Sequence, residues 1–432
     1  MSAQSGEPPG MHIALWVMAA GVCAALHVGK LAPAVSTLQQ ALGMSLVQAG
    51  FLLSLVQAAG MCLGLLMGAF ADSLGGRRSI ALGLLVLGLA SILGATVPAN
   101  AAAVSLLMAL RFVEGLGFLW VVLPAPGLVR AWVPPHRLSQ MMGVWGAYMP
   151  LATALALLVG PWCLVLGGWR LWWLLLGALS LLMVPALWRV LDPASEAEKR
   201  RAGASAARAL APVARPEGPA ILSRHSRLRQ TLSAPGPWAV AVCFAMYSGQ
   251  WLAVIGFLPS IVQAAGFSVT TTGLFAAGVA ATNVVGNVVA GRLMQRGVAP
   301  QRLLRLGFAT MALTTWMAFA AWPGTGSEPA LPAAVRFVAL LVFSGAGGLI
   351  PATLFAQAVR LAPSEQTLGS TVGWMQQWSS LGQFLGPPAV AWVASQVGGW
   401  HMTWAVTGAC CLGGLASSVV IASLLAKPRT AA

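Results

Sequence analysis

Long apolar runs dominate this chain, and short stretches rich in charge, proline, glycine or asparagine separate them. A helix that crosses the roughly 30 Å hydrocarbon core of a bilayer needs about 20 mostly apolar residues. Twelve runs are about that long, and each predicts a membrane-spanning helix. Their approximate limits are 11–32, 46–70, 79–97, 101–130, 139–164, 169–190, 236–261, 269–293, 303–322, 331–358, 367–395 and 401–425.

The composition supports this pattern. Of the 432 residues, 58% are hydrophobic and only 8% are charged, whereas about 25% of the residues of a soluble domain are charged. A soluble globule could not cover so much apolar surface, and a disordered chain would be far more polar. We therefore expect an all-α polytopic membrane protein whose surroundings are the lipid bilayer.

The charges indicate how the helices are oriented. Lys and Arg number 24 against 9 Asp and Glu, and twenty of the 24 basic residues fall on one side when the spans alternate. This positive-inside bias predicts that both termini are cytoplasmic, which fits the inner membrane of a bacterium. No basic helix is interleaved with aromatic stacking residues, so a nucleic-acid partner is not expected.

The two halves of the chain resemble each other. The segment 45–50 matches 268–273, and Arg111–Val113 matches Arg336–Val338, with offsets of 223 and 225 residues. Parallel repeats of six helices are typical of transporters whose two bundles rock around a shared site. We expect two pseudo-symmetric six-helix bundles, at 1–191 and 236–432, joined by a polar cytoplasmic linker at 192–235.

The loop after the second span carries a motif. It reads Gly-Ala-Phe-Ala-Asp-Ser-Leu-Gly-Gly-Arg-Arg from 68 to 78 and resembles the loop signature of the major facilitator superfamily. The resemblance implies twelve helices, alternating access, a central cavity and a monomer. The sequence pattern of the first two spans is also similar to that of the subgroup of cyanate porters and small-anion carriers. The gating residues that the motif implies are Gly68, Asp72, Gly75, Arg77 and Arg78.

Ionisable groups at membrane depth are costly and usually functional. Arg111 and Glu114 lie about mid-span, and the stretch around them resembles a pattern seen in proton antiporters of the superfamily. Arg336 is the repeat partner of Arg111, and a guanidinium pair in one cavity would suit an anion. The alternative is a structural Arg111–Glu114 pair with Arg336 at the interface. Glu114 and His27 are candidate proton carriers, and both His27 and Lys30 are expected near the outer mouth.

Other polar and aromatic side chains are placed to line a cavity, although hydrogen bonding between helices is the more common role of such polar residues in bundles. These candidates for substrate binding are Tyr247, Gln250, Asn283, Asn287, Gln376 and Trp374.

These features predict a secondary active transporter that moves a small organic or inorganic anion by alternating access, coupled to protons. The alternative is proton-coupled efflux of drugs or amphipathic metabolites. The sequence contains no P-loop, no spacing typical of a metal site and no nucleophile–base constellation. We therefore expect neither an enzyme nor a bound cofactor.

Overall fold

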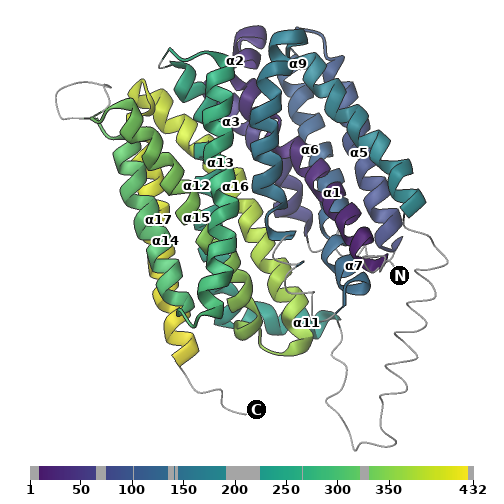
Figure 1. The fold of residues 1–432 in the computed structure, drawn as a ribbon, viewed down its shortest axis with the longest axis vertical. Coiled ribbons are helices and arrows are strands. Elements are labelled where there is room, and N and C mark those ends of the chain that lie inside the picture. The colour runs from purple at the N-terminus through teal and green to yellow at the C-terminus, as the bar shows by residue number, and fades with distance from the viewer. Residues whose placement is uncertain are drawn as a thin grey trace, which may run out of the picture.

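The computed structural model describes residues 9–64, 74–100, 102–134, 141, 145–190, 224–264, 266–321 and 330–426. These residues are largely helical, and they form two bundles that stand side by side (Figure 1). The N-terminal bundle contains α1 (Pro9–Gly29), α2 (Leu31–Leu42), α3 (Leu46–Ser54), η1 (Leu55–Gln57), α5 (Gly76–Ala95), α6 (Ala103–Val122), α7 (Ala125–Trp132) and α9 (Tyr148–Val190).

A short helix, α11 (Arg224–Ser233), lies within the range predicted as the linker and packs against η2, α12 and α16. The start of α1 and the end of α17 lie at the same end of the two bundles (Figure 1). The C-terminal bundle contains α12 (Pro235–Ala264), α13 (Val269–Gln295), α14 (Pro300–Phe319), α15 (Ala333–Leu361), η2 (Glu365–Thr367), α16 (Leu368–Val397), η3 (Trp400–Met402) and α17 (Thr403–Ala426).

The expected twelve-helix architecture is confirmed. Within the described residues, nine segments are long and apolar enough to cross a membrane. One of them, α9, is two helices that meet at Gly167 and Gly168, whose backbone angles are not helical. Two further helices, α14 and α16, occupy the positions predicted for the ninth and eleventh spans.

The first span is longer than predicted. Together α1 and α2 form one apolar span from His12 to Leu42, rather than one that ends near residue 32. The helix is interrupted only at Lys30 and resumes at once. Pro33 lies in the first turn of α2, where a backbone N–H has no partner within the helix, so proline does not end the helix there.

Local structure supports the predicted repeat. The side chains of Ser45 and Ser268 each cap a helix, α3 and α13, by accepting a hydrogen bond from the backbone N–H three residues later. Gly43 and Gly266 precede these caps with φ of 63° and 88°, a left-handed conformation that favours glycine. Each pair is separated by 223 residues, so both halves begin their second span in the same way.

The two halves meet near the end opposite the described termini, which the charge pattern predicts to be the outer end. Here α2 packs against α12, α3 against α16, and α9 against α13. The hydroxyl of Ser36 donates to that of Ser260 across the interface at 3.2 Å. At Gly273 a β-carbon would lie 2.8 Å from the carbonyl oxygen of Leu157, so only glycine permits this approach of α13 to α9. The structure is therefore closed at its predicted outer end.

Candidate functional site

Glu114 lies at the centre of a charged cluster inside the N-terminal bundle. Its Oε2 accepts a hydrogen bond from Nη1 of Arg111, one turn earlier on α6, at 2.5 Å. Its Oε1 accepts from the ammonium group of Lys30, at the junction of α1 and α2. All three side chains are at most 2% exposed. A carboxylate of the fourth span therefore joins two cations from two different spans.

His27 completes the cluster from α1. Its Nδ1 lies 3.7 Å from Oε1 of Glu114, and its Nε2 shares a hydrogen bond of 2.7 Å with the hydroxyl of Ser180 on α9. His27 is fully buried. The two predicted proton carriers, Glu114 and His27, are thus brought together, although they lie 87 residues apart in the sequence.

The positions of His27 and Lys30 correct the sequence analysis, which placed both residues near the outer mouth. Lys30 is fully buried, donates to Ser91 Oγ at 3.0 Å and lies 4.6 Å from the centre of the Trp173 ring. The physical reason is the longer first span. Lys30 stands twelve residues before its end at Leu42, roughly 18 Å at 1.5 Å per residue.

Arg111 ties three helices together. Its Nη1 also donates to the carbonyl oxygen of His27 at 2.6 Å, and its Nε donates to that of Leu52 on α3 at 3.2 Å. Its Nη2 is buried and has no hydrogen-bond partner among the described residues. With Lys30 and Arg111 charged against one carboxylate, the described cluster holds one excess positive charge in the buried interior, which is costly.

The equivalent region of the C-terminal bundle is neutral. Trp251 on α12 stands 224 residues after His27, and its indole N–H donates to Ser344 Oγ at 3.1 Å. Asn283 on α13 donates to the Tyr247 hydroxyl and to the Ser344 carbonyl oxygen, each at 2.9 Å. The predicted residues Tyr247 and Asn283 therefore lie together in a network that needs no charge.

The other predicted polar residues lie in different settings. Asn287 donates to the Asn283 carbonyl oxygen at 3.0 Å. Gln250 is buried and accepts from the Cys411 thiol at 3.3 Å, so it faces α17. Trp374 packs edge to face against Trp238, with ring centres 4.9 Å apart, and Gln376 is half-buried on the same helix.

Arg336 does not join Arg111. Helix α15 begins at Ala333, so Arg336 lies in its first turn, and its Nε donates to the carbonyl oxygen of Ala318 at 2.7 Å. The side chain is half-buried. The two guanidinium groups lie in different bundles and bind different partners, because the tenth helix starts too late to carry Arg336 to the depth of Arg111.

Part of the predicted gating motif is described. Gly75 has φ of 80° and precedes α5. The Arg77 guanidinium stacks 3.9 Å from the Trp188 ring centre and donates to its carbonyl oxygen at 2.8 Å. Arg78 is exposed. Arg77 thus anchors α5 to the end of α9. Gly68 and Asp72 lie outside the described residues.

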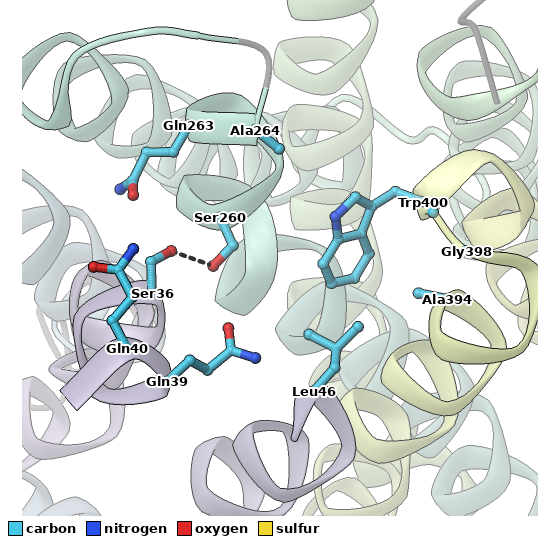
Figure 2. Close-up of a pocket in the computed structure, with 11 residues that line it drawn as sticks. Ser36, Gln39, Gln40, Leu46, Ser260, Gln263, Ala264, Ala394, Gly398 and Trp400 are labelled. Carbon is cyan, nitrogen blue, oxygen red and sulfur yellow. Dashed lines mark hydrogen bonds between the residues drawn. The ribbon is translucent and has the colours of Figure 1, made fainter. Parts of the chain in front are cut away.

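A cavity of about 760 Å³ lies between the two bundles at the predicted outer end (Figure 2). The sequence analysis missed it, although the offset of 224 that relates Ser36 to Ser260 and Gln39 to Gln263 could have indicated it. The polar and aromatic lining of the cavity consists of Ser36, Gln39, Gln40, Ser260, Gln263 and Trp400.

In the described part of the chain, no group of His, Cys, Asp or Glu could hold a metal.

Solved structures with the same fold are known. A bacterial homolog of the human lysosomal transporter Spinster, inward-facing and unoccupied, superposes with a TM-score of 0.71 at 16% identity, covering 98% of this chain and 95% of that one. A D-xylose-proton symporter gives a TM-score of 0.71 at 15% identity, covering 95% and 97%. No curated protein sequence matches this chain.

The sequence matches the Major Facilitator Superfamily over residues 17–319 and 239–432. The likeness to cyanate porters is not tested by these matches and stays a prediction. The family match covers nearly the whole sequence, and the twelve-helix fold agrees with it, so the chain belongs to the major facilitator superfamily.

Proposed function

We propose that this membrane transporter couples the movement of a small polar solute to the movement of protons through the cluster of Glu114, Lys30, Arg111 and His27. The observation that carries the proposal is the position of Glu114, a buried carboxylate that holds cations from two spans at once. Ionisable groups buried at membrane depth are kept for function because they cost stability.

A purely structural role for the cluster is less well supported. In the N-terminal bundle, Lys30 and Glu114 connect the first span to α6. The C-terminal bundle connects the repeat-related helices α12 and α15 through the neutral hydrogen bond from the Trp251 indole to Ser344. Since neutral groups suffice in one half, the charges of the other half are not needed to pack the helices.

The available ligands favour a proton over a metal ion for coupling. A sodium ion needs several oxygen ligands, whereas the described side chains at the cluster supply only the Glu114 carboxylate, already bonded to two cations, and the hydroxyls of Ser91 and Ser180. A proton on Glu114 would instead abolish the negative charge that holds Lys30 to α6. Arg111 would keep its bonds to the carbonyl oxygens of His27 and Leu52. Protonation would therefore free the end of α1 at Lys30 from α6, while Arg111 still joins α6 to α3 and to α1 at His27. The bundle would then have two arrangements, with Lys30 bound to Glu114 or released from it.

The substrate and the orientation are further parts of the proposal. The anionic substrate predicted from the sequence rested on Arg111 and Arg336 sharing a cavity, which they do not. The positions of the two arginines therefore do not favour an anion over a neutral solute, and a transport test must include solutes of both kinds. We place both termini in the cytoplasm of a bacterium, with the closed end outside, because basic residues concentrate on the terminal side.

The first experiment needs no known substrate. A cysteine introduced at Ser36, which is half-buried and bonded to Ser260 across the closed interface, is labelled with a membrane-impermeant maleimide in proteoliposomes at a series of pH values. Labelling is expressed relative to the denatured protein at the same pH, because the thiolate is the reactive form of cysteine. We expect this relative labelling to depend on pH in the otherwise native chain and not in the Glu114→Gln variant. Glu198→Gln makes the same chemical change in the predicted linker and should leave the pH dependence intact. A Glu114→Gln variant whose labelling still follows pH would refute the proposed coupling.

The second experiment measures transport. Proteoliposomes are given labelled myo-inositol, mannitol, lactate and nitrate, with and without a pH gradient. The pH gradient should increase net uptake of a transported solute at least tenfold, and Glu114→Gln should abolish the increase while leaving exchange of that solute between the two sides.

A further inference from the structure

The outer cavity is built from equivalent residues of the two repeats. Ser36 and Gln39 on α2 correspond to Ser260 and Gln263 on α12, each with an offset of 224 residues. Ser36 and Ser260 are also hydrogen-bonded to each other across the two bundles. The cavity therefore lies where the pseudo-two-fold axis leaves the bundle, and both bundles contribute to it.

The polar groups in the cavity are neutral and have hydrogen-bonding capacity to spare. No hydrogen bond within the described residues joins the side-chain amides of Gln39, Gln40 or Gln263 to another group. Each amide offers two donors and one acceptor, and each serine hydroxyl can donate and accept. The described residues that line the cavity include no charged side chain, so a charged ligand would lose hydration without gaining a counter-charge. This favours a neutral ligand that both donates and accepts.

An aromatic wall completes the lining. The Trp400 indole extends into the space between the helices, as does Gln39 (Figure 2). Trp400 packs against Phe257, with ring centres 5.0 Å apart and a tilt of 42°, so its orientation is supported from behind. A flat apolar face beside free amides suits a compact solute that has both C–H and O–H surfaces.

The floor of the cavity is closed. Ser36 and Ser260 each lie one helical turn deeper than the paired glutamines, and their hydrogen bond spans the gap. One turn deeper still, Gly256 on α12 faces Leu53 of α3, whose side chain would lie 3.3 Å from a β-carbon at Gly256. Leu53 is 1% exposed. A solute in the cavity is therefore held above a polar bridge and an apolar plug.

We propose that this cavity is an outer binding site for a small uncharged polyhydroxylated solute, with Gln39 and Gln263 as its paired hydrogen-bonding residues and Trp400 as its apolar wall. The inference deepens the proposed function by naming a solute class. It rests on transport of that solute and not on proton coupling through Glu114.

The test is equilibrium dialysis of the purified full-length protein in detergent with radiolabelled myo-inositol and mannitol, and with lactate as the anionic probe. We expect saturable binding of at least one polyol and none of lactate. Gln39→Ala and Gln263→Ala should each weaken binding about two- to tenfold, which corresponds to the loss of one neutral hydrogen bond. Gln230→Ala, at an exposed glutamine of α11, is the matched control and should bind as the native protein does.

The outcomes separate the two proposals. Polyol binding that survives Glu114→Gln, together with loss of the pH effect, supports both. Binding without any pH effect in the native protein supports the outer site and overturns the coupling. The outer site would be overturned, whatever the pH dependence, by any of three results: no polyol binding, binding of lactate alone, or polyol binding by Gln39→Ala and Gln263→Ala that is as tight as in the native protein.

Discussion

Removing the carboxylate and removing one cation of the buried cluster should have very different costs. Glu114→Gln leaves Lys30 and Arg111 facing each other without a counter-charge. Breaking a buried ion pair by deleting one partner costs about 3–5 kcal/mol. One kcal/mol lowers Tm by about 2–4 °C in a unit of 150–250 residues, so we expect a decrease of about 6–20 °C.

Lys30→Met should be much milder. Methionine keeps most of the apolar stem and leaves Arg111 and Glu114 as a balanced pair. The variant loses the hydrogen bonds to Glu114 and Ser91, worth about 1.5–3 kcal/mol each, and the contact with the Trp173 ring, worth about 2 kcal/mol. It also removes the desolvation penalty of the excess charge, which is several kcal/mol. These terms nearly cancel, so Tm should change by less than about 5 °C.

The assay is thermal unfolding of detergent-solubilised protein at a fixed scan rate. A thiol-reactive fluorophore reports it, because buried free cysteines, including Cys23 and Cys243, become accessible on unfolding. Glu198→Gln serves as the control for the carboxylate change. If Lys30→Met lowers Tm as much as Glu114→Gln does, the cluster carries no excess charge and the reasoning is refuted.

Three further outcomes can be checked with the same material. Ser180→Ala removes the hydroxyl bonded to His27 and should cost about 1–3 kcal/mol; an unchanged Tm would show that this contact is not stabilising. Gly273→Val cannot keep the close approach of α13 to Pro161 on α9, so it should increase maleimide labelling at the closed end, and unchanged labelling would contradict the assigned closure. Arg336→Ala should leave the KM for any transported solute within about twofold, since within the described residues its side chain donates only to the Ala318 carbonyl oxygen; a tenfold rise in KM would indicate that Arg336 does contact the substrate.

Much of the fold follows from the sequence. Twelve apolar runs are enough to predict twelve spanning helices, because a helix is the one element whose backbone hydrogen bonds are all satisfied within a single lipid-exposed segment. The offset of about 224 residues located the repeat without structural knowledge, since equivalent caps such as Ser45 and Ser268 use the same local chemistry. Arg111 and Glu114 were identifiable as candidates because charge at membrane depth is rare.

The tertiary structure decided how those residues are combined. Lys30 was assigned to the surface because the sequence does not show that the first span continues to Leu42, with Pro33 harmless in a first helical turn. Arg336 was paired with Arg111 because a repeat relates positions in the sequence and not their depths, which depend on where each helix begins. The outer cavity depends on the distance between two bundles. That distance is set by contacts such as Gly273 against Leu157, more than 100 residues apart, which no local pattern records.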